Sequence, residues 1–328
     1  MQGLRQQRRS LYCCSINIAA QIKHGHQKYC REQENIMKQY ACIDIGGTAI
    51  KYAMLTEEGQ IITQGQRPTN IDTDGSGDIP RKIAAIVQSL QAECGQAAGV
   101  AVCSPGLIDA EKGEVIFAGP NFPGYSGMKL RAEIEKLTHL PCTVENDVNA
   151  AGLGESWLGA GQGTKSAFCI FVGTGIGGAL VLDGHVVHGA AAAAGEIGFL
   201  PSDGGHLERV ASVPVLLKQT GAATGEEVFQ RAAAGDEKAL AALDDMTKKI
   251  AQGLAAICCV VNPEVLIMGG AIMAQQDYFA PRLNKYLQEL LPAALLANTH
   301  IAFARLGTAA GFTGALRYFL QTKREILA

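Results

Sequence analysis

The apolar positions of the chain alternate between helical periodicity and short continuous runs. Ile83, Ile86, Val87 and Leu90 recur at the spacing of one helix face, in a stretch that opens near Pro80. Similar patterns predict helices at residues 77–98, 127–137, 147–158, 225–235, 237–262 and 279–291. Apolar runs predict buried strands at 100–103, 143–145 and 265–268. Because strands and helices alternate, we expect a mostly parallel α/β core.

Residues 43–62, IDIGGTAIKYAMLTEEGQII, interrupt an apolar strand with an acid, two glycines and a threonine. A second alternating strand follows at once and ends in a Glu58-Gly59 turn, so the glycine turn lies inside a β-hairpin. Gly46 and Gly47 lack the Cβ atoms that would keep backbone N–H groups away from an anion, which is typical of a phosphate-binding turn. The segment matches neither G-x-x-x-x-G-K-[ST] nor a dinucleotide fingerprint. From this segment alone, a plain Gly-rich hairpin is an equal alternative.

The same arrangement returns at residues 168–187, FCIFVGTGIGGALVLDGHVV. Here too an apolar strand, a Gly/Thr turn and a second strand are followed by a turn at Asp183-Gly184. A repeat of so unusual a hairpin argues against the plain alternative. It predicts two related α/β lobes with a cleft between them, each lobe presenting one turn to the phosphates of a nucleotide.

Composition and charge exclude several classes of protein. With 328 residues, 48% hydrophobic and 18% charged, the chain can fill the cores of two domains. A net charge of −3 gives no reason to expect nucleic acid or an anionic membrane as a partner. No apolar run reaches the roughly 18 residues of a membrane span. The ten cysteines include no C-x-x-C, so we interpret them as reduced thiols of a cytoplasmic protein.

Residues 1–36 differ from the rest because they are polar and basic. Their mildly apolar patch from Leu11 to Ala20 is interrupted by Ser15 and Asn17, whereas a signal peptide needs a cleaner apolar core. We expect this extension to be disordered or frayed and to contribute nothing to chemistry, with Met37 as a candidate translation start.

With both hairpins, the chain resembles the ROK family of sugar kinases and repressors, within the actin, hexokinase and Hsp70 superfamily, from about residue 41 to 316. Further matching stretches follow in the family's order: CSPGLID (103–109), AGPNFPGY (118–125), LPCTVENDVNAAGLGE (140–155), AGEIGF (194–199), NPEVLIMGGAI (262–272) and GTAAGFTGAL (307–316).

The resemblance implies an α/β, two-lobed actin-like (ribonuclease H-like) ATPase fold, with duplicated β-hairpin phosphate loops and a cleft between the lobes. It implies a small lobe at residues 37–141 and a large lobe at 142–308. A last helix, roughly 309–320 within the C-terminal segment 309–328, is expected to pack back on the small lobe.

Asp147 is the candidate for the central chemistry. A sugar hydroxyl is a poor nucleophile at neutral pH, so phosphoryl transfer needs a carboxylate that accepts its proton. Asp147, in ENDVN, lies where a helix begins, and the positive end of the helix dipole favours its ionised form. From position alone, an N-cap role for Asp147 or Asn146 is the alternative. The resemblance implies that Asp147 is the general base.

Sugars are held by planar polar groups that bind adjacent hydroxyls bidentately. Residue type and resemblance both indicate Asn121 and Asn146. Asn121 lies between two prolines, so an Asx turn is its alternative role. The resemblance implies Glu196 as a further sugar ligand and, more loosely, Glu208, because the residues before Glu208 differ from the family pattern.

Position 199 departs from that pattern. Many family members have a histidine there, followed by three cysteines that complete a structural zinc site, whereas this chain has Phe199 and no cysteine in FLPSDGGHLE. Because a closed zinc site needs four ligands and His206 supplies one, we expect no zinc. Phe199 either makes the pocket around the sugar O1 apolar, as a β-glucoside kinase would need, or fills the volume of the missing metal cluster.

The expected cofactors are ATP and Mg²⁺. The resemblance implies that both hairpin turns face the phosphates, through Gly46, Gly47, Thr48, Thr174 and Gly175. Asp44 is expected to act on Mg²⁺ through water, because this ion sheds its hydration shell reluctantly. Gly269 and Gly270 follow a buried strand and are expected near adenine and ribose, although a glycine pair there is also an ordinary turn.

Two classes of function stay open, an ATP-dependent sugar kinase acting on a 6-hydroxyl and a sugar-responsive repressor. Residues 1–36 are too short for a winged-helix domain, and Asp44, the GGT turn and Asp147 are intact, so the kinase is favoured. Candidate substrates are glucose, a β-glucoside such as cellobiose or gentiobiose, and N-acetylmannosamine or another hexosamine. The expected partner is a small-molecule sugar, and a homodimer is the family norm.

Overall fold

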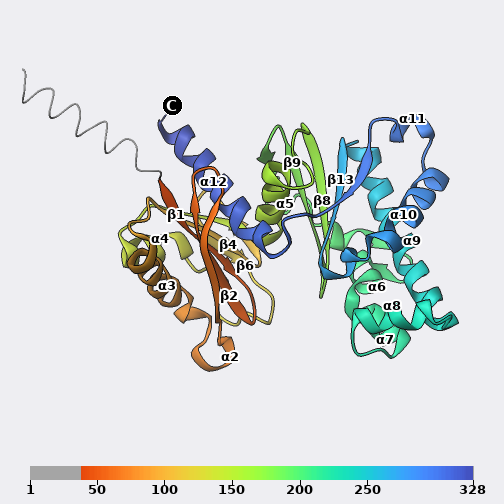
Figure 1. Ribbon diagram of the computed structural model, residues 1–328, viewed down its shortest axis with the longest axis horizontal. Helices are drawn as coiled ribbons and strands as arrows, with labels where there is room; N and C mark the ends of the chain where they lie inside the picture. Colours follow the sequence, from red (N-terminus) through yellow and green to blue (C-terminus); the bar gives the residue numbers. More distant parts are fainter. Residues whose placement is uncertain (1–37, 328) are drawn as a thin grey trace, which may run out of the picture. The chain divides into compact units, whose positions relative to one another are not determined.

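Two five-stranded sheets organise residues 38–327, the part of the chain that the computed structural model describes (Figure 1). The expectations for residues 1–36 and for a start at Met37 lie outside the described residues. The first sheet has the strand order β3-β2-β1-β4-β7. Its strands are β1 (Gln39–Ile45), β2 (Ala49–Thr56), β3 (Ile61–Pro68), β4 (Val100–Ser104) and β7 (Cys142–Asn146).

The second sheet repeats the topology of the first. Its order is β10-β9-β8-β13-β14, with β8 (Ser166–Val172), β9 (Ile176–Leu182), β10 (His185–Val186), β13 (Val265–Gly269) and β14 (His300–Phe303). In each sheet an antiparallel hairpin (β1–β2 and β8–β9) is extended on its first strand by two parallel strands. The duplication predicted from the two glycine turns is therefore confirmed.

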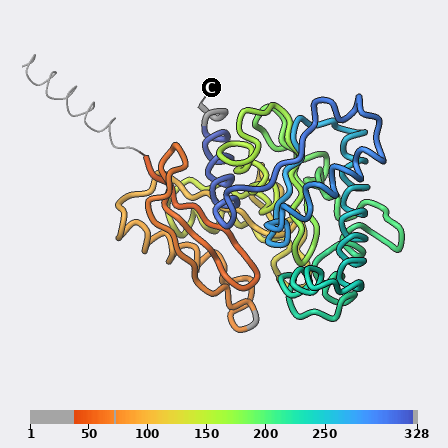
Figure 2. Tube along the Cα trace, turned by 45° about the vertical axis from the view of Figure 1, so that its right-hand side comes forward, coloured from red at the N-terminus to blue at the C-terminus, as the bar shows by residue number. Residues whose placement is uncertain are grey.

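Both faces of the first sheet are covered, because neighbouring residues of a strand point to opposite sides. Ile43 and Ile45 of β1 belong to a core that includes residues of two helices, α3 (Ile79–Cys94) and α4 (Leu130–Thr138). Cys42 of the same strand belongs to another core, with Phe312 of α12 (Ala310–Leu327). The C-terminal helix therefore returns to the first sheet, as Figure 2 also shows.

The largest core lies on one face of the second sheet and includes Phe168, Ile170 and Met268. Its helices are α6 (Leu207–Ala211), α7 (Val213–Thr220), α8 (Gly225–Ala233), α9 (Glu237–Val260) and α10 (Gln276–Leu290). On the other face, Cys169 packs with Leu153 of α5 (Asp147–Leu158).

Short elements complete the described part of the chain. They are α2 (Ile71–Asp74), α11 (Ala293–Leu296), the β5–β6 hairpin (Leu107–Asp109 and Glu114–Phe117), the β11–β12 hairpin (Pro201–Ser202 and Gly205–His206), and the 3₁₀ helices η1 (Ser76–Asp78), η2 (Ile197–Phe199), η3 (Ala271–Ala274) and η4 (Gly307–Ala309). No helix within residues 38–327 is long and apolar enough to cross a membrane.

The helices and strands expected from the sequence pattern are present, and α5 has the predicted bounds. The expected lobe boundary between residues 141 and 142 is wrong by one strand, because β7 pairs in parallel with β4 and so belongs to the first sheet. The sequence of a buried strand does not show which of two sheets the strand joins. A lobe boundary next to such a strand therefore cannot be placed from the sequence alone. The short helices α6 and α7 were not among the predicted elements.

Helices α5 and α12 lie between the two sheets (Figure 1) and pack against each other at glycines. Helix α5 follows a strand of the first sheet and packs on β8 and β9 of the second, whereas α12 follows the second sheet and packs on β1 and β4 of the first. A Cβ at Gly154 would lie 2.5 Å from the carbonyl oxygen of Ala310, and one at Gly314 would overlap the carbonyl oxygen of Ala150. The helix backbones are therefore in direct contact.

Gly314→Ala should destabilise the protein by at least about 1 to 3 kcal/mol, the usual cost of an overpacked core. The added methyl group would have to push two helix backbones apart. Thermal unfolding measures the effect, with Gly225→Ala as the matched control, because a Cβ there would meet its nearest atom at 3.9 Å. Equal melting temperatures for the two variants would contradict the direct contact between the helices.

Candidate active site

The β1–β2 turn is closed by backbone and side-chain hydrogen bonds. The Gly46 N–H donates to the Ala49 carbonyl (3.0 Å), and the Thr69 hydroxyl donates to the Gly46 carbonyl (2.6 Å). A Cβ at Gly46 would lie 2.8 Å from the Ala49 oxygen, so a side chain does not fit there without a shift. Gly47 and Thr48 at the tip are exposed.

Asp44 ends β1 beside this turn and has two partners. Lys51 faces it across the antiparallel pair, with 3.4 Å between Nζ and Oδ2. The Cys103 thiol on β4 donates to Oδ1 (3.5 Å). A Cβ at Gly311, in the first turn of α12, would lie 3.3 Å from the Asp44 carboxyl carbon. The carboxylate is thus held where β1, β4 and α12 meet.

A cavity of about 650 Å³ opens at this carboxylate, within the usual range of ligand sites. Its wall includes five of the predicted nucleotide-binding or catalytic residues, which come from the first hairpin, the start of α5 and the end of β13. These are Asp44, Gly46, Asp147, Gly269 and Gly270. The other predicted phosphate-facing residues do not line it: Gly47, Thr48, Thr174 and Gly175.

The cavity wall also contains residues that sequence reasoning missed. Lys51, Gln276 and Thr308 line it as polar groups, and Phe171 and Phe303 as apolar ones. Lys51 lies seven residues after Asp44 in the same quoted hairpin, so its position opposite Asp44 followed from the hairpin register. Gln276 and Phe303 have no local signal, because only the fold brings them to this wall.

At Gly269 and Gly270 the surrounding atoms leave no room for a side chain, unlike in an ordinary turn. Gly270 has φ +99°, and a Cβ there would overlap the carbonyl oxygen of Val172. A Cβ at Gly269 would overlap the ring of Phe171. Glycine is therefore required at both positions, where the chain leaves β13 along the cavity wall.

The second hairpin turn is held by Glu208. Glu208 Oε2 accepts the Ile176 N–H (2.9 Å), and a Cβ at Gly175 would lie 2.5 Å from this oxygen. The Gly173 carbonyl accepts the Val213 N–H (3.0 Å). Glu208 thus supports the turn that contains Thr174 and Gly175, a contact that the sequence pattern did not indicate.

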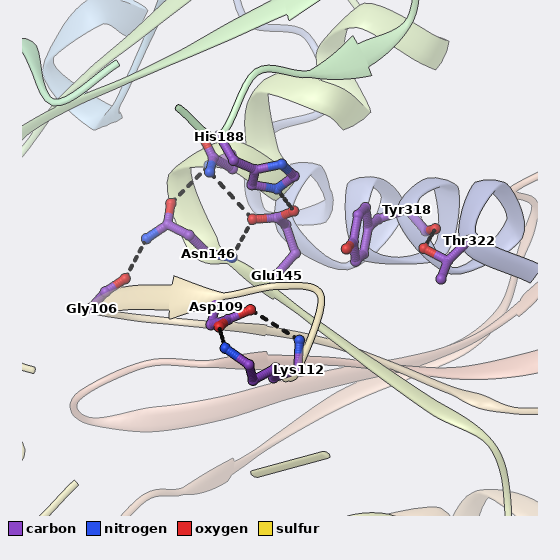
Figure 3. A network of polar contacts seen from close by, with 9 residues as sticks. Gly106, Asp109, Lys112, Glu145, Asn146, His188, Tyr318 and Thr322 are labelled. Atoms are coloured by element: carbon purple, nitrogen blue, oxygen red, sulfur yellow. Dashed lines mark hydrogen bonds and ion pairs between the residues drawn. The ribbon is translucent and has the colours of Figure 1, made fainter. Parts of the chain in front are cut away.

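Asn146 caps α5, which decides between the two N-cap alternatives. Its Oδ1 accepts the Asn149 N–H (2.9 Å), and its Nδ2 donates to the Gly106 carbonyl (2.8 Å; Figure 3) and to Asp147 Oδ1 (3.1 Å). Asp147 is the first residue of the helix and is not the cap. Because both Nδ2 protons have protein acceptors, a bidentate sugar contact by Asn146 requires one of these bonds to be exchanged.

The Asp147 carboxylate has an unusual protonation equilibrium. Its pKa is raised to about 7, chiefly by burial and then by the negative charges of Asp44 and Glu196, whereas the Val148 N–H bonded to Oδ1 opposes the rise. The pKa of Glu196 is also raised, first by burial and then by Glu208. A carboxyl group poised near neutrality can accept a proton in a reaction at that pH.

Asn121 lies exposed in the loop between β6 and α4. An Asx turn does not form there. In such a turn the Asn121 side-chain oxygen would accept the backbone N–H of residue 123, but residue 123 is proline and has no N–H. Next to it, buried Phe122 approaches Gly47, whose Cβ would lie 3.9 Å from the Phe122 ring. The loop carrying Asn121 is therefore packed against the first hairpin turn.

Phe199 is 68% exposed, so it does not fill the core of this chain. Its ring meets His206 edge-on, with 5.9 Å between centroids, and its carbonyl contacts His206 Nδ1 (3.1 Å). Within residues 38–327, no three His, Cys, Asp or Glu side chains are grouped to hold a metal ion.

ATP and Mg²⁺ fit the donor set of the cavity. Asp44 offers the hard oxygen that Mg²⁺ prefers, with room for the water molecules that this ion retains. Lys51 and the backbone of Gly46 suit phosphate, and the apolar wall at Phe171 and Phe303 suits a purine ring.

Comparison with known proteins identifies relatives of this chain. A family model described as "ROK family" matches residues 40–322. The chain is 31% identical to a glucokinase of Halalkalibacterium halodurans, over 84% of this chain and 93% of the relative. It is 30% identical to a beta-glucoside kinase of Listeria monocytogenes, over 87% and 98%.

A solved structure extends the likeness to three dimensions. It is a ROK family glucokinase from Streptomyces griseus in complex with glucose and AMPPNP, with a TM-score of 0.72 and 26% identity, covering 85% of this chain and 98% of that one. With the duplicated sheets, this likeness confirms the predicted actin-like ATPase fold.

Proposed function

The chain belongs to the ROK family, and we propose that this ATP-dependent carbohydrate kinase transfers the γ-phosphoryl group of ATP to the 6-hydroxyl of a hexose or β-glucoside, with Asp147 as the general base. The observation that carries the proposal is the position of Asp147. It lines the same cavity as Asp44, Gly46 and Gly270, and Asn146 takes over the N-cap role that would otherwise explain it.

Each side chain has a distinct part in the proposed reaction. When bound, ATP would supply the phosphoryl group and Mg²⁺ would neutralise the negative charge of the phosphates. Asp44 would hold Mg²⁺ through water, and Lys51, which is paired with Asp44 in this structure, would contact phosphate oxygens. Asp147 accepts the proton of the attacking hydroxyl, and the Val148 N–H keeps its Oδ1 in place.

The sugar is held on the other side of Asp147 in this proposal. Asn121, Asn146, Glu196 and Glu208 are the proposed ligands. The charge of Glu196 raises the pKa of Asp147 and the charge of Glu208 raises the pKa of Glu196, which supports placing both glutamates near the base. Glu208 would bind with the oxygen that does not accept the Ile176 N–H. Phosphate contacts by Gly47, Thr48, Thr174 and Gly175 require the two turns to move toward the cavity, since they do not line it.

The substrate is tested by ADP release with purified protein and a panel of glucose, cellobiose, gentiobiose, an aryl β-glucoside, N-acetylmannosamine and N-acetylglucosamine. We expect turnover with at least one 6-hydroxyl sugar and none with its 6-deoxy analogue. If no sugar accelerates ADP release, the kinase proposal fails. We further propose a cytoplasmic homodimer. It should lack structural zinc, because segment 199–208 contains one nitrogen ligand, His206, and no cysteine.

Phe199→His should lower the kcat/KM for a β-linked disaccharide relative to glucose by about 10-fold or more, if the exposed ring contacts the second sugar. Loss of one apolar contact is worth about 1 to 3 kcal/mol. Steady-state kinetics with both sugars gives the ratio, and Phe117→His is the control, because Phe117 is similarly exposed on β6. An unchanged ratio in Phe199→His would make glucose the better substrate assignment.

The kcat/KM for the sugar should rise with pH through about 7 and level off above it, because Asp147 must be ionised to accept a proton. Neutralising the charge of Asp44 lowers the pKa of Asp147, so the midpoint should move to lower pH at higher Mg²⁺ concentration. A pH series of initial rates at two Mg²⁺ concentrations measures both effects. A flat profile between pH 5 and 8 would contradict the assignment.

A further inference from the structure

An ion pair between a buried glutamate and a partly exposed histidine joins two segments that are far apart in the sequence. His188 Nε2 lies 2.6 Å from Glu145 Oε2 (Figure 3). Glu145 is on β7 and its side chain is fully buried, whereas the His188 side chain is 31% exposed. His188 follows β10 and precedes the turn that carries Glu196. The pair therefore ties that segment to the strand that leads into Asp147.

Glu145 organises the junction between β7 and α5. Its Oε1 accepts the Asn146 N–H (2.7 Å) and Asn149 Nδ2 (3.2 Å). These two residues flank Asp147, and the Asn146 side chain in turn donates to Asp147 Oδ1 (3.1 Å). The Glu145 carboxylate is thus linked to Asp147 through one intervening residue, Asn146, whose backbone N–H contacts Glu145 and whose side chain contacts Asp147.

The surroundings of His188 favour its charged form. The hydrogen bond to Glu145 raises the pKa of His188 most, against the opposing effect of burial, and Asp109 on the β5 strand adds to the rise. The ring of Tyr318 on α12 meets the imidazole edge-on, with 6.0 Å between centroids. A buried carboxylate requires such a partner, because an uncompensated charge is costly away from water.

His188 also closes its own segment. Its carbonyl oxygen accepts the Ala194 N–H (3.0 Å), so residues 188–194 form a loop anchored at its first residue. Glu196 follows this loop by two residues. The contact of the His188 imidazole with Glu145 therefore anchors a closed loop whose other end leads to Glu196.

We propose that His188 is a positioning residue for phosphoryl transfer, which acts through Glu145 on Asn146 and Asp147 and through its loop on Glu196. The inference rests on the proposed function for its kinetic consequence. The proposal also has a structural part that does not depend on the substrate: the His188–Glu145 contact orders residues 146–149 and the loop that leads to Glu196. Sugar binding and the general base are thereby connected by a contact outside the cavity wall.

Kinetics of three variants test the catalytic half. His188→Leu removes the contact, whereas His188→Gln keeps a donor for Glu145. His185→Leu is the matched control, because His185 is an exposed histidine of the same chain segment that contacts its own turn at Asp183. For His188→Leu we expect the kcat/KM for the sugar to fall on the order of 10- to 100-fold, the usual effect of losing a hydrogen bond to a charged group.

We expect the KM for ATP to stay within twofold in all variants, and His188→Gln to recover most of the sugar kcat/KM. The double variant Glu145→Gln/His188→Leu removes both charges together. It replaces His188→Leu in these measurements if His188→Leu alone does not fold. A purely structural role would lower the melting temperature without raising the KM for the sugar or lowering the kcat of the folded fraction. That result would overturn the proposal.

Hydrogen exchange of the free protein tests the structural half. Exchange should become faster in residues 146–149 and 189–197 of His188→Leu and should stay unchanged in His185→Leu. Unchanged exchange in both segments of His188→Leu would overturn the proposal whatever the substrate is. If the wild-type enzyme phosphorylates no sugar, the proposed function fails separately, and exchange still decides whether His188 orders the site.

Discussion

Asp147→Asn should reduce kcat by about 10²- to 10⁴-fold, the usual contribution of general-base catalysis. The amide keeps the shape and polarity of the carboxyl group but cannot accept the proton of the sugar hydroxyl. It can still accept the Val148 N–H through its oxygen, so the start of α5 should be preserved. Sugar affinity should therefore stay within a few-fold. Single-turnover kinetics and calorimetry measure the two quantities separately.

Asp183→Asn makes the same chemical change outside the cavity. Asp183 is an exposed turn residue with φ +49°, a conformation that asparagine tolerates well, so this variant should match the wild type. Residual activity of Asp147→Asn within tenfold of the wild type would remove Asp147 from the role of base. A large loss of sugar affinity would instead identify it as a binding residue.

Asp44→Ala should nearly abolish turnover through the metal and the nucleotide, with sugar affinity retained. The substitution removes the carboxylate at the cavity wall and leaves Lys51 without its partner across the hairpin. Excess Mg²⁺ should restore activity only in part, because the ion keeps its phosphate contacts but loses its orientation by the protein. Calorimetric titrations with Mg-ATP and with the sugar distinguish the two affinities.

Asp245→Ala is a control for loss of an ion pair as such. Asp245 pairs with Lys249 on α9 at 2.6 Å and does not line the cavity. This variant should keep full activity. Normal Mg-ATP affinity in Asp44→Ala, together with lost sugar affinity, would show that the two ligands had been assigned to the wrong sides of the cavity.

Sequence alone predicted those parts of the site that depend on local chain geometry. The two glycine turns, Asp44 at a strand end and Asp147 at a helix start each follow from strand and helix signals within a few residues. The N-cap of α5 could not be assigned to Asn146 or Asp147, because the choice depends on one backbone dihedral. Asn146 has extended backbone, with φ −64° and ψ 146°, and so becomes the cap.

The missed features depend on contacts between distant segments. Glu145 and His188 are 43 positions apart, and Glu208 reaches the Ile176 N–H over 32. The sequence around Glu145 and around Glu208 contains no local pattern that identifies the residue each of them contacts. The exposure of Phe199 likewise depends on how the β11–β12 hairpin folds over α6, which no run of apolar residues specifies.

The glycine crossing of α5 and α12 connects two parts of the cavity wall mechanically. Helix α5 begins at Asp147, and α12 begins at Ala310 and Gly311 beside Asp44. With backbone against backbone at Gly154 and Gly314, no side chains can rearrange to absorb a shift of one helix against the other. If the sugar binds at the first turn of α5 as proposed, any tilt of α5 on binding must therefore displace α12, and with it the part of the wall proposed to face the nucleotide.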